Sequence, residues 1–173
     1  MVKNYIFLIL ILVGSTCLGQ ESLNVFDVAR NGTVEQAKVL LNQDAEIFNT
    51  VNEGGYSPLM LACYRGNIKV AQFLMENGAD INVKSSMGSP LMAAVVKGNI
   101  EIVKALLAKK ADVNATDANG ITALIYAVQF RNEEILKLLL AYNADKTHID
   151  KEGKTAFEHA VFTGNESIIN LLK

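Results

Sequence analysis

The residues of this 173-residue chain whose types could support chemistry are two histidines, two cysteines and a recurring aspartate. His148 and His159 stand eleven residues apart, and neither has a cysteine or carboxylate at ligand spacing, which predicts structural roles and no metal site. The aspartates recur at one turn of similar segments, where local backbone hydrogen bonding explains them better than catalysis. They are Asp80, Asp112 and Asp145.

Catalytic motifs are missing from the sequence. There is no Gly-rich phosphate loop, nucleophile elbow, cysteine pair or zinc-protease helix. We therefore expect no enzyme, no catalytic residue and no cofactor. The alternative is an enzyme or ligand-binding protein that uses the Cys63 thiol, although a cysteine beside the core alanine of a helix is normally buried and inert.

An apolar segment near the N-terminus has the layout of a secretory signal. Lys3 precedes nine apolar residues, Tyr5 to Val13, and small and polar residues follow. A helix needs about 20 apolar residues to cross a bilayer, so we expect no membrane span. Residues 1–19 are predicted to be a signal peptide cleaved after Gly19, which leaves a periplasmic or secreted domain at residues 20–173.

A lipoprotein is the alternative, because a cysteine behind an apolar run can be an acylation site. The chain would then be a membrane-anchored scaffold acylated at Cys17. The residues before it, Gly14 to Thr16, lack the aliphatic side chain expected three places upstream. In both cases Cys63 is the one cysteine left for the folded domain, so we expect no internal disulfide.

The charge pattern argues against nucleic acid as a partner. The chain has 16 basic and 18 acidic residues, a net charge of −2, and these charges are scattered. Binding to a phosphate backbone requires a basic run or face. We expect no nucleic-acid binding.

A repeat in the sequence predicts the helices and loops that position the histidines, Cys63 and the recurring aspartates. Four alanines, Ala62, Ala94, Ala127 and Ala160, recur at intervals of 32, 33 and 33 residues. A fixed period of this length indicates a repeat array. The surrounding segments agree, as in SPLMLACYRGN from Ser57, SPLMAAVVKGN from Ser89 and TALIYAVQFRN from Thr122.

Each copy is predicted to form a helix, a turn, a second helix and an extended loop. A hydroxyl residue begins each first helix as its N-cap, and proline follows it in two copies, at a position where no backbone donor is needed. A glycine in the left-handed conformation is expected between the helices. The N-caps are Ser57, Ser89, Thr122 and Thr155, and the glycines are Gly66, Gly98 and Gly164.

This pattern resembles the ankyrin repeat. In the second copy, the matching residues are Gly55, Ser57, Pro58, Leu59, Ala62, Gly66 and Gly78 to Asp80. The resemblance covers about residues 22–173 and implies an all-α ankyrin-repeat solenoid of about five helix–turn–helix repeats with short hairpin-like fingers. The repeats are placed at about 22–52, 53–85, 86–117, 118–150 and 151–173. The first copy is degenerate and is expected to cap the stack, and the array is expected to end with the fifth.

The sequence departs from the family pattern in three places. The family's first-helix histidine is replaced by Met60, Met92, Ile125 and Glu158, so packing must substitute for its hydrogen bond. Arg131 occupies a turn position that favours glycine, at a cost of roughly 1–2 kcal/mol in a left-handed conformation. The loop from Asn82 to Pro90 is one residue shorter than its counterpart, which predicts a blunted or tilted finger.

The resemblance places the variable positions of each copy in a groove between the fingers and the first helices. These positions are unusually apolar, and aromatic and arginine side chains are common anchors of protein interfaces. The predicted binding residues are Tyr56, Tyr64, Arg65, Val96, Lys97, Ile121, Gln129, Phe130 and Phe162. Alternatively, Val96 and Phe162 belong to the core between repeats, and no contiguous patch exists.

The predicted function is an exported, non-catalytic module that holds another protein in this groove, as an adaptor, inhibitor or protective partner. The resemblance is to small exported bacterial ankyrin proteins, and we expect a monomer. Its partner is a protein whose identity the sequence does not determine.

Overall fold

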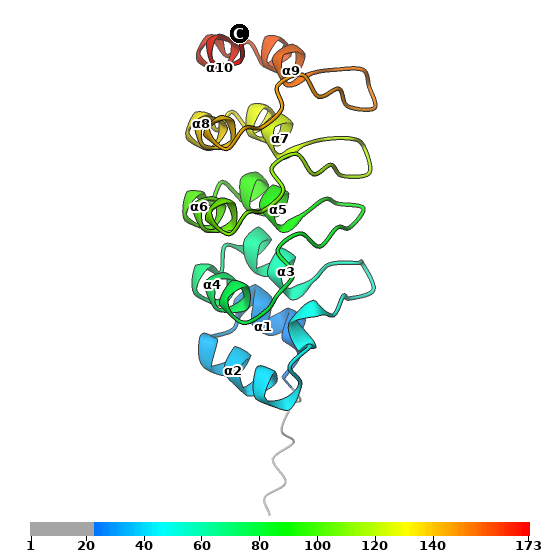
Figure 1. Cartoon of the computed structure of the whole chain (residues 1–173), viewed down its shortest axis with the longest axis vertical. Helices are drawn as coiled ribbons and strands as arrows, with labels where there is room; N and C mark the ends of the chain where they lie inside the picture. The colour runs from blue at the N-terminus through cyan, green and yellow to red at the C-terminus, as the bar shows by residue number, and fades with distance from the viewer. Residues whose placement is uncertain (1–22) are drawn as a thin grey trace, which may run out of the picture.

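The protein is a single stack of helix pairs. The computed structural model describes residues 23–173, so the predicted signal peptide and Cys17 lie outside the described part. Within residues 23–173 there are ten α-helices, one 3₁₀ helix and no named β-strand. The pairs follow one another from bottom to top in chain order (Figure 1). The predicted all-α solenoid is confirmed.

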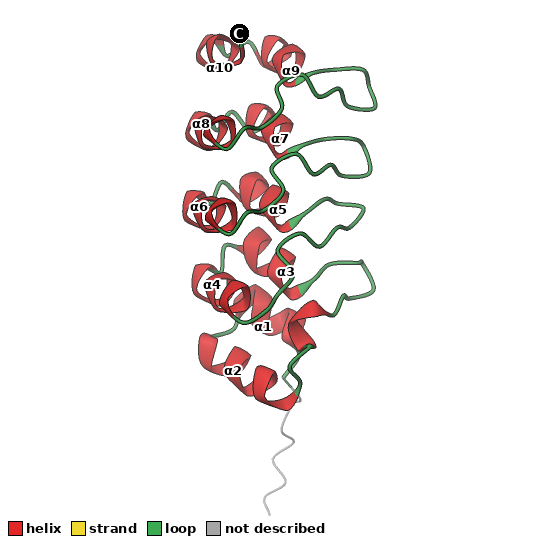
Figure 2. Cartoon of the chain, viewed as in Figure 1, coloured by secondary structure: helices red, strands yellow, loops and turns green. Residues whose placement is uncertain are grey.

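Each pair has one helix next to the loops and one on the far side (Figure 2). The inner helices are α1 (Val25–Asn31), α3 (Pro58–Arg65), α5 (Pro90–Lys97), α7 (Ala123–Gln129) and α9 (Ala156–Thr163). The outer helices are α2 (Val34–Gln43), α4 (Ile68–Glu76), α6 (Ile100–Ala108), α8 (Glu133–Ala141) and α10 (Glu166–Leu172). The 3₁₀ helix η1 (Ile47–Asn49) follows α2.

The ends of the inner helices are set by the predicted residues. The hydroxyls of Ser57, Ser89, Thr122 and Thr155 each accept a hydrogen bond from the backbone amide three residues later. Gly66, Gly98 and Gly164 are left-handed, with φ of 73°, 74° and 66°. Because these caps depend on residues adjacent in sequence, they follow directly from the local pattern.

The core runs continuously through the stack. The recurring alanines are fully buried, which lets the inner helices approach their neighbours closely. Three side chains that replace the family histidine, Met60, Met92 and Ile125, are also buried. The fourth, Glu158, accepts a hydrogen bond from the Thr155 amide and completes a capping box.

Four fingers project on the side of the inner helices (Figure 2). Three of them close with a backbone hydrogen bond spanning five residues, as from Asp117 N to Ile121 O. In the finger before α5 the corresponding bond runs from Ser85 N to Gly88 O, so this finger is one residue shorter, as predicted. Within the described residues the fingers form only isolated bridges, because each pairs too few residues for a ladder.

A ladder of asparagine side chains joins successive copies. The Oδ1 atoms of Asn49, Asn82 and Asn114 accept 2.8 Å hydrogen bonds from the backbone amides of Asp80, Asp112 and Asp145, respectively. Each of these aspartates in turn accepts a bond from an amide two residues later. The recurring aspartates therefore bond to local backbone, as the sequence predicts.

Among residues 23–173, three residues other than glycine have a left-handed backbone. Arg131 has φ of 54°, as predicted, and Lys110 and Asn143 have φ of 65° and 62°. Lys110 and Asn143 follow the outer helices, where Gly78 is left-handed in the second copy. The Arg131 guanidinium donates to Thr163 O at 3.2 Å, which offsets part of its strain.

Lys110→Gly is expected to raise the free energy of unfolding by about 1 kcal/mol, because glycine has no Cβ to strain a left-handed backbone. Arg131→Gly should give a smaller gain, since it also removes the bond to Thr163 O. Urea unfolding followed by circular dichroism measures both changes. The matched control is Lys109→Gly, because Lys109 has φ of −87° and gains no relief. Equal changes at positions 109 and 110 would contradict the strain argument.

Candidate partner-binding groove

The fingers and inner helices enclose a groove with two large pockets. A third pocket of about 230 Å³ shares Arg30, Asn52 and Gly54 with the N-terminal one and contains the carboxylates of Asp27 and Glu53. The N-terminal pocket has a volume of about 620 Å³. Its lining residues are Arg30, Asn52, Gly54, Tyr56, Met60, Leu61, Tyr64, Arg65, Met87, Met92, Ala93, Val96, Tyr126 and Phe130. They come from two fingers and four inner helices, so the pocket depends on the stacking of several copies.

The C-terminal pocket has a volume of about 710 Å³ and is lined by the last two fingers together with α7 and α9. Its lining residues are Ile121, Gln129, Asp150, Glu152, Lys154, Glu158, His159, Val161, Phe162 and Thr163. This pocket contains three carboxylates, whereas the N-terminal pocket contains none. These two pockets therefore differ in charge.

The structure places eight of the nine predicted binding residues in these two pockets. Tyr56, Tyr64, Arg65, Val96 and Phe130 line the N-terminal pocket. Ile121, Gln129 and Phe162 line the C-terminal pocket. Lys97 lines neither pocket. Its side chain lies next to Gly66, beside Arg65, because its Cε atom is 3.5 Å from the point where a Cβ atom on residue 66 would stand.

Exposed aromatic side chains mark both pockets. Tyr64 and Phe130 are 55% and 54% exposed, and Phe162 is 93% exposed. The alternative that Phe162 fills the core is therefore wrong, because the side chain has no neighbouring surface to cover it. Val96 is half-buried and faces the N-terminal pocket. Side chains of this size at the surface are typical of interaction sites.

Several pocket residues were missed in the sequence. Met87 is 58% exposed in the short finger, and Tyr126 packs against Phe130 with 6.4 Å between ring centroids. Tyr126 lies four residues after its N-cap, at the position of Leu61 in the second copy. A comparison of this position between copies, which holds Leu61, Ala93, Tyr126 and His159, would have detected two polar rings beside two aliphatic residues.

Buried carboxylates hold two fingers in shape. Asp150 accepts bonds from the amides of Glu152 and Lys154 at 2.9 Å, and its Oδ2 lies 2.7 Å from His159 Nε2. Asp117 has the same role one copy earlier, where the third partner is the Tyr126 hydroxyl at 2.7 Å. These bonds fasten each finger to its inner helix and so fix the wall of the groove.

The same contacts shift the pKa values. Burial alone would raise the pKa of Asp150, but hydrogen bonds from His159 and from two backbone amides outweigh it and lower that pKa. Burial raises the pKa of Tyr126 to about 12, and the hydrogen bond to Asp117 adds to this rise. These groups are tied to structural partners and are not arranged for proton transfer.

The other residues whose types could support chemistry also have structural contacts within the fold. His148 Nε2 lies 2.8 Å from Gly120 O. In residues 23–173 no group of three or more His, Cys, Asp or Glu side chains is placed to hold a metal ion. None of the helices described there has the length and apolar composition to span a bilayer.

Cys63 is fully buried in α3, and burial raises the pKa of its thiol far above the usual range. We expect the native thiol to resist a maleimide reagent for as long as the fold persists, and to react within minutes in urea. Intact mass after timed labelling measures this. Rapid labelling of the native protein would instead support the alternative of a ligand-binding or catalytic thiol.

Comparison with known proteins gives one family. The family described as "Ankyrin repeats (3 copies)" has a sequence model that matches residues 25–85 and 91–173, which together cover most of the chain. Individual relatives match over shorter segments of 50 to 68 residues, and they include ankyrin-repeat proteins and a kinase. Because ankyrin-repeat domains are generally non-catalytic binding modules, the short match to a kinase does not indicate kinase activity.

Three relatives are representative. Mouse Serine/threonine-protein kinase TNNI3K is 42% identical over 50 residues, 29% of this chain and 6% of that protein. Human Ankyrin repeat family A protein 2 is 37% identical over 68 residues, 39% of this chain and 21% of that protein. Zebrafish Ankyrin repeat and SAM domain-containing protein 6 is 36% identical over 59 residues, 34% of this chain and 8% of that protein. The chain thus spans at most about a fifth of these relatives.

Proposed function

This chain belongs to the ankyrin-repeat family, and from that premise we propose that it is a non-catalytic module that holds a protein partner in the groove. One observation carries this proposal: Tyr64 and Phe130, each more than half exposed, line one pocket together with Arg65. Aromatic and arginine side chains supply most of the binding energy at protein interfaces. The partner would be held by burial of these side chains.

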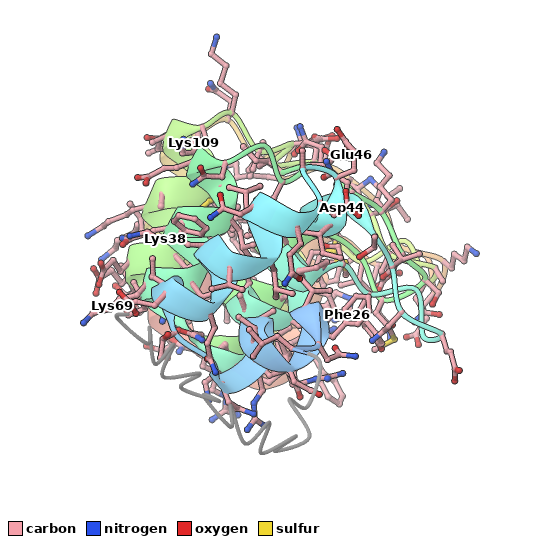
Figure 3. The ribbon with its side chains drawn as sticks, turned by 90° about the horizontal axis from the view of Figure 1, so that it is seen from below. Phe26, Lys38, Asp44, Glu46, Lys69 and Lys109 are labelled. Atoms are coloured by element: carbon pink, nitrogen blue, oxygen red, sulfur yellow. The ribbon has the colours of Figure 1, made fainter. Side chains whose placement is uncertain are left out.

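Site-specific cross-linking tests where a partner binds. We expect a photoreactive phenylalanine analogue at Phe130 to cross-link a protein from the extract of the natural host. The controls carry the analogue at Lys38 or Lys69, which lie on the side of the outer helices (Figure 3). Cross-links of equal yield from all three positions would count against the groove.

A matched set of substitutions tests the same surface. Replacing Tyr64, Arg65 and Phe130 by serine should abolish capture, while the circular dichroism spectrum stays unchanged because all three side chains are exposed. The control is Tyr142→Ser, which removes a 44% exposed aromatic side chain at the end of outer helix α8. Retained capture by the triple variant would reject the groove as the binding site.

We also propose that the protein is an exported bacterial protein that acts outside the cytoplasm as an adaptor, inhibitor or protective partner. The support is the signal-like segment at residues 1–19. Intact mass of the protein from its natural host separates the two forms of export. A chain that begins at Gln20 supports a soluble protein, and a chain that begins with diacylated Cys17 supports the lipoprotein scaffold.

A further inference from the structure

We infer that the groove binds an extended protein segment with a defined order of charges. An apolar side chain of this segment enters the N-terminal pocket, carboxylates beside it face Arg65 and Lys97, and a basic residue lies toward the C-terminal pocket. This inference rests on the proposed function and specifies the chemistry of the partner.

A row of basic residues runs along the ends of the inner helices. Arg30, Arg65 and Lys97 lie in the last turns of α1, α3 and α5, respectively, so each of the first three copies contributes one cation. The neighbours are close, because Arg65 donates to Asn31 of α1 and Lys97 lies over Gly66. A helix C-terminus favours cations, which explains why Arg65 and Lys97 are stable there without carboxylates.

Most of this charge is not neutralised by the protein. Arg30 pairs with Asp27 at 2.9 Å. Arg65 and Lys97, in contrast, have no carboxylate oxygen within 4.0 Å among the described residues. No lining residue of the N-terminal pocket is acidic, although acidic residues outnumber basic ones in the whole chain. The cations therefore remain available to carboxylates of a partner.

The C-terminal pocket has the opposite balance. Its lining includes the carboxylates of Asp150, Glu152 and Glu158 and one ammonium, that of Lys154. Asp150 is bonded to His159 and Glu152 to Lys154, so the exposed Glu158 is the lining carboxylate that has no cation within 4.0 Å among the described residues. Like charges placed opposite each other in an interface are strongly unfavourable. A partner segment with carboxylates at both ends would be repelled here, whereas a lysine or arginine would be attracted. The groove thus selects for an order of charges.

The spacing of the row favours an extended conformation. Packed helices lie about 8–10 Å apart, and an extended polyproline-II chain advances about 9 Å in three residues while returning to the same face. Carboxylates three residues apart on such a chain would meet successive cations. Met87, which is 58% exposed, lines the pocket with an adaptable thioether side chain that suits an aromatic or leucine anchor.

Selection from a displayed library of random twelve-residue peptides tests this inference on the described domain. We expect an aromatic or leucine residue flanked by Asp or Glu at three-residue spacing, with Lys or Arg further along, enriched at least tenfold. Synthetic peptides from this selection should bind the Arg65→Glu, Lys97→Glu variant at least tenfold more weakly. The matched control is Lys38→Glu, Lys69→Glu, which makes the same charge change on the outer face and should bind normally.

Each other outcome has a definite meaning. Selected peptides that require Phe130 but show no acidic preference would overturn the charge order and leave the proposed function intact. Peptides that bind a Tyr64→Ser, Phe130→Ser variant as well as they bind the wild type would overturn the inference. A selection without enrichment of any peptide class would also overturn it. In both cases, cross-linking from position 130 tests the proposed function separately. Displacement of the peptide by single-stranded DNA at equal affinity would show an unselective anion surface and also reject the inference.

Discussion

Asp150→Ala is expected to lower the free energy of unfolding at pH 7 by about 2–4 kcal/mol. The Asp150 carboxylate is buried and binds two backbone amides and His159. Its loss leaves these groups without a partner, at about 1–3 kcal/mol for a buried polar group, with a lower cost where water can reach it. Urea unfolding measures the change. The control is Glu152→Ala, which removes only a surface ion pair with Lys154 and should cost less than about 1 kcal/mol.

The same carboxylate should make stability depend on pH. Because hydrogen bonds lower the pKa of folded Asp150, ionised Asp150 stabilises the native state. This contribution is present in full above the unfolded pKa, near 4, and is lost as the pH falls through the lower folded value. The difference in the free energy of unfolding between wild type and Asp150→Asn should therefore become smaller below about pH 4. A constant difference from pH 7 to pH 3 would contradict the role of the ionised form.

Ile102→Ala should lower the free energy of unfolding by about 2–5 kcal/mol. Ile102 is fully buried in α6, in the middle of the stack, and its truncation removes apolar contacts and leaves a cavity. The matched control is Ile149→Ala, since Ile149 is 59% exposed and its truncation should change stability by no more than about 0.5 kcal/mol. Urea unfolding by circular dichroism compares the two isoleucines directly.

The position of Ile102 also predicts how the protein unfolds. In a stack, each copy contacts only its neighbours, so a weak central copy uncouples the two ends. We expect the single transition of the wild type to broaden or to split in Ile102→Ala. A sharp single transition, with a decrease of less than about 1 kcal/mol in the free energy of unfolding, would show that this side chain adds little to the coupling between the two ends of the stack.

The helices and their ends could be predicted because their causes are local. Ser57 caps α3 through an amide three residues away, and Gly66 ends the helix through its own backbone freedom. Arg131 was identified as strained by comparison with the glycines of other copies, and its φ of 54° confirms this. In each case the cause of the conformation lies in the residue itself or in a group a few positions away in the sequence.

The remaining features depend on residues that become neighbours only after folding. Asn82 bonds to the amide of Asp112, thirty residues later, and His159 reaches Asp150 across a finger. In the groove, the sequence could identify the exposed positions because they vary between copies. It could not divide them between two pockets or add Met87, since the path of each finger decides which side chains converge.

The asparagine ladder has a direction that matters during synthesis. In every rung the acceptor, such as Asn49, precedes the donor amide, such as that of Asp80, in the chain. A copy leaving the ribosome therefore meets an acceptor that has already been made. Chains generally fold from the N-terminus as they emerge. The stack can thus be assembled vectorially, one copy at a time, without waiting for the C-terminal copies to appear.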